Sequence, residues 1–304
     1  MADIQAWYRE VIKDKVTIKF QAHGGLLDGT MMSGDTQANT VKFPIAGRTE
    51  VYKLTGAIER VPTGGIDLNT VQVTMDDFEA SGWWRTQDAY KAGPSEQNTL
   101  ANLIVNAVRR KRDKIKIDAL TAFCNLNAGT EIVTIGDGTG IIDVLDVERA
   151  RAEIASTGAD EEEYATVFCM LPAMWMTQLC FYPEWKDGKF VGLDNAPFSK
   201  TQRMKMKTVR GVNYIEAPDE YFTEYDTGKL ETFMWHRDSM GAETPWNQEA
   251  PSMKQHDEMQ GDPWLVKAGL GGAALGIQEK GVKRLRFSKI TAPTRPPVIT
   301  KAAA

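Results

Sequence analysis

The stretch NAVRRKRDKIKID, residues 106–118, concentrates positive charge within about two turns of a helix. Six basic side chains occupy eight consecutive positions, although the whole chain is acidic, with a formal net charge of −5. The fold must therefore provide solvent or acidic partners for these basic side chains. The basic cluster consists of Arg109, Arg110, Lys111, Arg112, Lys114 and Lys116.

The basic cluster lies in the strongest helix candidate of the chain, residues 94–124. Pro94 followed by Ser95 is a typical helix start. Successive helical positions are about 100° apart, so the six charges spread around the helix and form no single stripe. We therefore expect a long helix that crosses the molecule, is buried along one narrow line and is exposed on much of its circumference. That apolar line comprises Leu100, Ile104, Val108, Ile115, Ala119 and Phe123.

Length and composition indicate a soluble globular protein. The 304 residues, 42% of them hydrophobic, allow one large domain or two ordinary ones. An isoelectric point near 5.4 argues against a dedicated DNA-binding domain. The three cysteines include no CxxC pair, which predicts a reduced, intracellular chain. Neither a signal sequence nor a membrane span is expected, since the longest weakly polar run, residues 268–277, is short and rich in glycine.

Residues 44–80 predict a long hairpin-like excursion. Strand-like sequence covers residues 40–56, Gly64 and Gly65 mark a turn, and residues 70–75 return as a strand. A lone two-stranded hairpin is marginal in water, so it must lie on something else. Its charged residues fit poorly in a private core, which favours a neighbouring chain as the support. The alternative is a hairpin packed on its own domain. The charged residues in question are Arg48, Glu50, Lys53, Glu59 and Arg60.

After residue 125 the pattern changes to mixed α and β, which predicts an α+β fold. A helix is expected at residues 146–156, capped by Asp143 or Asp146, and a second one beginning at Pro172. The sequence ATVFCML, residues 165–171, predicts a buried strand. Further strands are expected within residues 131–140, 204–218, 230–237, 262–277 and 281–288.

The motifs that resemble reactive sites favour structural explanations. GDGTG, residues 136–140, lacks the spacing of a phosphate-binding loop and predicts a tight turn. The three histidines are too scattered to propose a metal site, and His236 is expected to satisfy a local hydrogen bond. Cys169 is expected to be a buried apolar side chain, because nothing pairs it with a base. We therefore expect neither catalysis nor a cofactor or metal.

The order of these pieces resembles the major capsid protein of tailed bacteriophages, the Hong Kong 97-type fold, in its podophage-like branch. VKFPIAGRT and VYKLTG, within residues 41–56, resemble the beginning of that family's extended loop. RGVNYIEAP, residues 210–218, and FMWHRDSMG, residues 233–241, resemble strand-and-turn segments of its central sheet. Each match is short, but their order and spacing extend from about His23 to Phe287.

The resemblance implies a subunit that assembles with itself, as hexamers and pentamers, into an icosahedral shell around double-stranded DNA. It further implies a separate scaffolding protein, a portal, assembly in the host cytoplasm and a place in the virion. An encapsulin-like compartment shell and a soluble α+β enzyme are the alternatives. The implied parts are an N-terminal arm at 1–43, an extended loop at 44–82, a peripheral domain at 83–128 and 245–268 with a spine helix at about 94–124, an axial domain at 129–244 and 269–290, and a C-terminal tail at 291–304.

Two groups of residues are then candidates for contacts between subunits. For the basic cluster three interpretations stay open: a solvated helix, contacts to acidic neighbours, and a lining for packaged DNA. In helical projection Arg109, Arg112 and Lys116 share one arc, and Arg110 and Lys114 share the opposite side. The candidates for the subunit interface are Arg48, Glu50, Lys53, Glu59, Arg60, Trp83 and Trp84.

Overall fold

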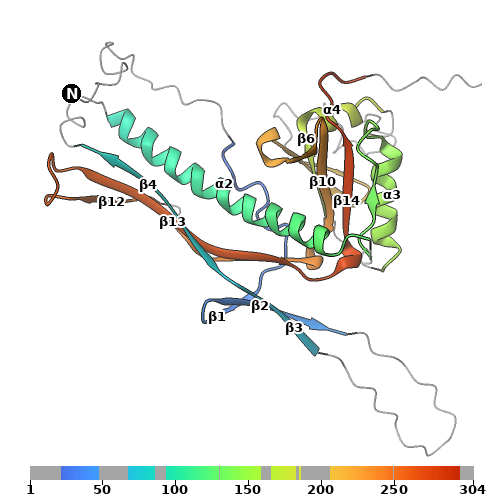
Figure 1. The fold of residues 1–304 in the computed structure, drawn as a ribbon, viewed down its shortest axis with the longest axis horizontal. Coiled ribbons are helices and arrows are strands. Elements are labelled where there is room, and N and C mark those ends of the chain that lie inside the picture. The colour runs from blue at the N-terminus through green and yellow to red at the C-terminus, as the bar shows by residue number, and fades with distance from the viewer. Residues whose placement is uncertain are drawn as a thin grey trace, which may run out of the picture.

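The computed structural model shows an elongated part and a compact part, joined near one end of a long helix (Figure 1). The elongated part combines the first half of this helix with a four-stranded sheet, and the compact part is built on a seven-stranded sheet. Within the described residues, no helix combines the length and apolar character needed to cross a membrane. The structure describes residues 22–47, 68–85, 94–129, 131–158, 166–182, 185, 206–248 and 250–294.

The long helix, α2, spans Pro94–Leu126 and agrees with the predicted helix to within two residues at its end. Its 33 residues give it a length of about 50 Å. Ile104 and Val108 of the predicted apolar line are buried against the four-stranded sheet. Farther along, the line is wrong, because the compact part lies on another side of the helix. There the buried positions are Ile117, Leu120 and Cys124, whereas Ile115, Ala119 and Phe123 are only partly buried.

The four-stranded sheet is organised by its longest strand, β13. All pairing is antiparallel, with β4 along one edge of β13 and with β12 and then β11 along the other. Residues 76–82, which the resemblance assigns to the extended loop, therefore lie in this sheet beside α2. Strand β13 continues without a break across residue 268, where the resemblance implies a domain boundary. The strands are β4 (Asp76–Trp84), β11 (Met240–Asn247), β12 (Ser252–Gln255) and β13 (Trp264–Gly276).

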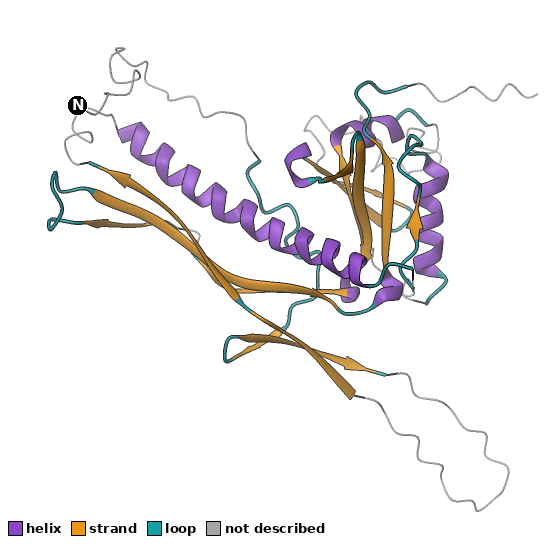
Figure 2. Cartoon of the chain, in the orientation of Figure 1, coloured by secondary structure: helices purple, strands orange, loops and turns teal. Residues whose placement is uncertain are grey.

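The sheet of the compact part has the order β5-β14-β10-β6-β8-β7, with β9 paired to β10. Helices α3 (Val144–Ala155) and α4 (Ala173–Leu179) contribute to the core on one face. The C-terminal half of α2 and residues 22–31 cover the other face (Figure 2). The strands are β5 (Thr134–Ile135), β6 (Val167–Pro172), β7 (Met206–Val209), β8 (Val212–Ala217), β9 (Glu224–Asp226), β10 (Lys229–His236) and β14 (Val282–Ser288).

Burial on both faces explains the uninterrupted apolar runs in this sheet. Cys169 belongs to the core under α3, whereas its neighbour Met170 belongs to the core under α2. Because successive strand residues point to opposite faces, both kinds of position must be apolar. Three short 3₁₀ helices complete the described structure: η3 (Asp219–Tyr221), η4 (Arg237–Ser239) and η5 (Glu279–Gly281).

The base of the predicted hairpin forms a small sheet of β1 (Asp35–Gln37), β2 (Thr40–Ala46) and β3 (Leu68–Thr74). This base extends away from the body of the molecule (Figure 1). Phe43 is fully buried, and a Cβ atom added to Gly241 of β11 would lie 2.4 Å from its ring. A Cβ added to Gly34 would lie 2.6 Å from the same ring. The two glycines thus leave the space in which Phe43 fastens the hairpin base to its own chain.

We predict that Phe43→Ala lowers the free energy of unfolding by about 3 kcal/mol, because truncating a buried phenylalanine removes apolar contact and leaves a cavity. Leu68→Ala is the matched control on the same hairpin, since Leu68 is 79% exposed. Its effect should stay within about 0.5 kcal/mol. Denaturant unfolding followed by circular dichroism measures both. Equal losses in the two variants would contradict the anchoring role of Phe43.

Candidate functional site

The basic cluster is not a solvated face of the helix. Of its six side chains, only Lys114 is exposed, and Lys116 retains 7% of its accessible surface. The expectation of a helix exposed on much of its circumference is therefore wrong here. The reason lies in residues 22–32, hereafter the arm segment, which cross α2 at the basic cluster.

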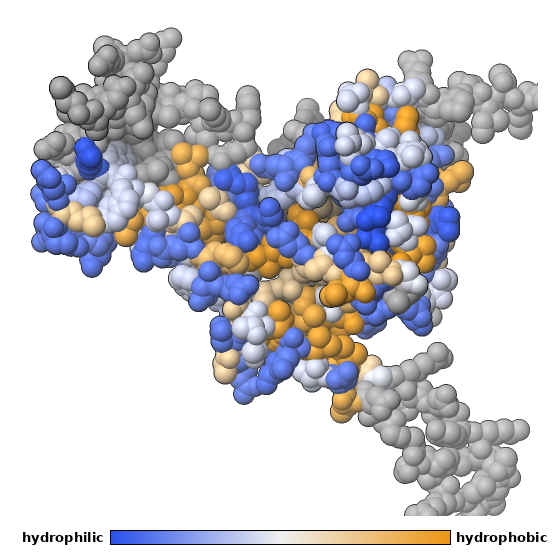
Figure 3. All heavy atoms as spheres, viewed as in Figure 1, coloured by the Kyte–Doolittle hydropathy of each residue, from blue (hydrophilic) through white to orange (hydrophobic). Residues whose placement is uncertain are grey.

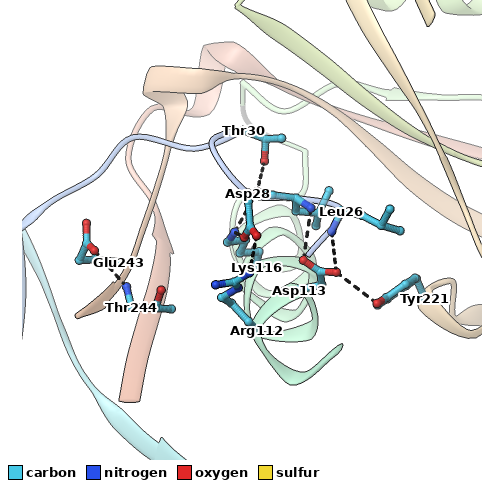
Figure 4. A network of polar contacts seen from close by, with 10 residues as sticks. Leu26, Asp28, Thr30, Arg112, Asp113, Lys116, Tyr221, Glu243 and Thr244 are labelled. Atoms are coloured by element: carbon cyan, nitrogen blue, oxygen red, sulfur yellow. Dashed lines mark hydrogen bonds and ion pairs between the residues drawn. The ribbon is translucent and has the colours of Figure 1, made fainter. Parts of the chain in front are cut away.

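Asp28 of the arm segment accepts two of the positive charges. Lys116 Nζ lies 3.0 Å from Asp28 Oδ1 and donates to the Leu27 carbonyl oxygen at 2.8 Å. The Arg112 guanidinium donates to Asp28 Oδ2 (Figure 4). The Asp28 side chain is 44% exposed, so water screens these pairs. Each such pair contributes at most about 1 kcal/mol.

Asp113, the one acidic residue within the basic cluster, is completely buried. Its Oδ2 accepts hydrogen bonds from Leu26 N at 3.0 Å and from the Tyr221 hydroxyl at 3.1 Å. Its Oδ1 accepts one from Leu27 N at 3.2 Å (Figure 4). Asp113 therefore joins α2, the arm segment and η3 of the compact part.

The same Asp113 carboxylate affects the hydroxyl of Tyr221. Burial raises the pKa of Tyr221 first, and the negative charge of Asp113 and its hydrogen bond raise it further. Tyr221 therefore keeps its proton at neutral pH and stays a hydrogen-bond donor. Sequence reasoning missed both residues. The available signal was an isolated acid among six basic neighbours.

Other hydrogen bonds fasten the two ends of the arm segment. At its beginning, Arg110 Nη1 donates to the Ala22 carbonyl at 2.9 Å, and Ala22 N donates to Glu220 Oε1 at 2.8 Å. Near its end, the indole N–H of Trp235 donates to the Thr30 carbonyl at 3.0 Å. Backbone bonds then tie Met32 to β11, where Met32 N donates to the Met240 carbonyl at 2.9 Å. The arm segment thus contacts both parts of the molecule.

The remaining members of the basic cluster have different surroundings. Lys111 Nζ lies 4.2 Å from the centre of the Phe78 ring, a cation–π contact with β4. Arg109 contacts the arm segment through its backbone, because a Cβ added to Gly24 would lie 2.4 Å from the carbonyl carbon of Arg109. Lys114 is exposed on the surface. The charges that sequence placed in two arcs are thus mostly committed to contacts within the chain.

The adjacent tryptophans Trp83 and Trp84 point to opposite faces of the sheet, as successive strand residues must. Trp84 is half-buried and lies on the face of Phe78 and Ala80, which pack with α2. Trp83 lies on the other face and is 52% exposed. Its one ring contact among the described residues is with His256, with 5.3 Å between the ring centres. The same face carries Trp246, which is 49% exposed. This outer face thus presents large apolar side chains.

A second apolar area lies over the hairpin base, where Figure 3 shows apolar side chains gathered at the surface. Leu68 is exposed there, and Val71 and Val73 are half-buried. The five charged candidates at positions 48, 50, 53, 59 and 60 lie outside the described residues.

The structure supports the structural interpretations of His236 and Cys169. His236 Nε2 lies 2.8 Å from Thr166 Oγ1, and its Nδ1 accepts from Asp238 N at 3.2 Å. Cys169 is fully buried, and burial raises the pKa of its thiol well above its usual range. Within the described part of the chain, His, Cys, Asp and Glu side chains form no group of three arranged to hold a metal ion.

Comparisons with known proteins identify a family. The sequence model of the family described as phage capsid protein matches residues 4–289. The capsid of Ralstonia phage GP4 is similar over 94% of this chain and 96% of that chain, with a TM-score of 0.69 and 10% identity. The cyanophage P-SCSP1u capsid is similar over 92% of this chain and 93% of that chain, with a TM-score of 0.65 and 10% identity. The cyanophage Pam1 capsid is similar over 96% of this chain and 100% of that chain, with a TM-score of 0.65 and 12% identity. No curated protein matches the sequence.

We predict that Gly24→Ala detaches the arm segment from α2, whereas Gly29→Ala does not. Both glycines have positive φ, +78° and +73°, so both substitutions carry a similar backbone cost. A Cβ at position 29 meets nothing within 4 Å, but one at position 24 would overlap the Arg109 backbone. Gly24→Ala should therefore cost about 1–3 kcal/mol more. Thermal unfolding and limited proteolysis compare the pair, and equal behaviour would contradict the close approach.

Proposed function

The chain belongs to the phage capsid protein family, and from this premise we propose that it assembles as hexamers and pentamers into an icosahedral shell around double-stranded DNA. It is a major capsid protein, a structural subunit of the virion. The observation that carries the proposal is the elongated helix-and-sheet part with its projecting hairpin base (Figure 1). Such a shape presents a sheet face and a projecting hairpin base that neighbouring subunits could contact.

The two implied domains would divide at the two parts of the fold, with bounds other than those that the resemblance implies, because β4 and β11 begin before residues 83 and 245 and β13 continues past residue 268. The peripheral domain would comprise the first half of α2 and the four-stranded sheet, and the axial domain the seven-stranded sheet. The extended loop would continue from the hairpin base that Phe43 anchors. Charged residues at 48–60 would then face a neighbouring subunit, because the base from which the loop continues extends away from the body of the molecule.

The outer face of the four-stranded sheet is the second proposed subunit contact. Exposed aromatic side chains in a patch mark surfaces that partners cover. Trp83 and Trp246 meet this description. Trp84 does not, because it lies on the helix side of the sheet.

Most of the basic cluster supports neither a DNA lining nor a strong contact to an acidic neighbour. Arg112 and Lys116 are paired with Asp28, and Arg110 donates to a carbonyl of the arm segment. Lys114 is the member left exposed and hence the candidate for packaged DNA or a neighbouring chain. A weak grip suits a genome that must leave the shell. Scaffolding protein, portal and assembly in the host cytoplasm complete the proposal.

Assembly of the purified chain tests this function. Expressed with its neighbouring phage proteins, the chain should give shells, capsomers or tubes by electron microscopy, and the shells should protect DNA from nuclease. A chain that stays a compact monomer at high concentration under these conditions would contradict the proposal. Shells that enclose a protein cargo and no DNA would favour the compartment alternative.

We predict that Trp83→Ala impairs assembly but changes the free energy of unfolding by less than about 1 kcal/mol, since its side chain is largely exposed. Trp84→Ala is the opposite-face control. It should lose about 2 kcal/mol, because it removes a large, half-buried aromatic side chain on the helix side of the sheet. Denaturant unfolding and quantitative electron microscopy separate the two effects. Parental assembly by Trp83→Ala would exclude the outer face as a contact.

A further inference from the structure

From residue 94 onward, three chain crossings within the described residues join the elongated part to the compact part, and all lie at one end of the compact part (Figure 1). They are the end of α2 at Leu126, the β10–β11 connection through η4, and the β13–β14 connection through η5. Near that end, Ile117, Leu120 and Cys124 of α2 already pack on the compact part. A contact at a point farther along the helix from this end adds leverage over the angle between the two parts.

Asp113 supplies such a point. It lies 13 residues before Leu126, which places it about 20 Å along the helix from the crossing. At that distance its carboxylate accepts from Tyr221 of the compact part and from the Leu26 and Leu27 amides of the arm segment. We propose that Asp113 is a positioning residue that sets the angle between the elongated and compact parts, and thereby the curvature of the assembled shell.

This inference rests on the proposed function, because curvature has meaning only in an assembly. Heterologous contacts between identical subunits close into rings and shells only when the rotation between neighbours fits. A small change in the shape of each subunit repeats at every contact. Loss of the angle should therefore change the shape of the particle more than it changes the folding of the subunit.

The Asp28 pairs are a weaker candidate for this role. Asp28 is 44% exposed, so water screens its pairs and can solvate its carboxylate when they break. Asp113 is fully buried, so removing its acceptor oxygens leaves buried donors without partners. Asparagine has the same shape but offers one acceptor oxygen and one NH₂ group. It would therefore direct a donor at one of the donors that Asp113 satisfies.

The decisive comparison is Asp113→Asn against Asp118→Asn in the full chain. Asp118 lies on the same helix but is exposed, so its variant controls for the loss of one charge. Hydrogen exchange of a peptide spanning residues 24–31 reports attachment of the arm segment. We expect exchange to be about tenfold faster or more in Asp113→Asn, because a hydrogen-bonded buried charge is lost, and parental in Asp118→Asn.

Particle shape is the second readout, taken with the neighbouring phage proteins at a temperature well below unfolding. Asp113→Asn should give tubes, open sheets or shells of mixed diameter, where the parent and Asp118→Asn give closed shells of one size. Closed shells of parental diameter from Asp113→Asn would overturn the positioning role, even with faster exchange. Parental exchange would overturn the network itself.

Tyr221→Phe covers the case in which Asp113→Asn does not fold. It retains the ring and removes one of the three hydrogen bonds, so it should show the same two changes in weaker form. Parental exchange and parental shells from Tyr221→Phe would overturn the proposal. If the parent itself forms no particles, the proposed function fails separately, whereas the exchange comparison still tests the contact in the unassembled chain.

Discussion

A single rigid helix buried in two separate cores is the constraint on which the rest of this structure depends. Near its beginning, α2 lies with Ile104 and Val108 on the four-stranded sheet, and near its end it lies with Leu120 and Cys124 on the seven-stranded sheet. A continuous helix does not bend freely, so both sheets must be placed relative to the same axis. The elongated shape of the subunit follows from this arrangement.

The arm segment explains why an acidic chain concentrates positive charge on this helix. The segment has little regular secondary structure, and four of its eleven residues are buried, so the polar groups of their backbone need partners from elsewhere. Arg110 and Lys116 donate to its carbonyl oxygens, and Asp113 accepts from its amides. The basic cluster is therefore first a set of hydrogen-bond donors for an irregular stretch of the same chain. Its exposed member, Lys114, is the one most accessible to another molecule.

The hairpin base shows a related division between internal anchoring and external contact. Phe43 fills the space left by Gly34 and Gly241 and attaches the base to its own chain. Trp83 and Leu68, in contrast, expose large apolar side chains. Covering them with a neighbouring chain would remove apolar surface from water. A subunit of a shell needs both features, because its projecting elements must be held in a defined direction before they meet a neighbour.

The sequence by itself determined the long helix, the α+β class and the family, and these predictions are confirmed. They depend on local periodicity, turn residues and the order of short motifs, which are properties of contiguous sequence. Only the tertiary structure decided which side of α2 is buried beyond Val108, that β4 joins β13, and what the basic cluster contacts. These outcomes depend on residues far apart in the chain, such as Asp113 with Tyr221 and Phe43 with Gly241. A helical projection shows where a charge points, but it contains nothing about the segment that will lie across it.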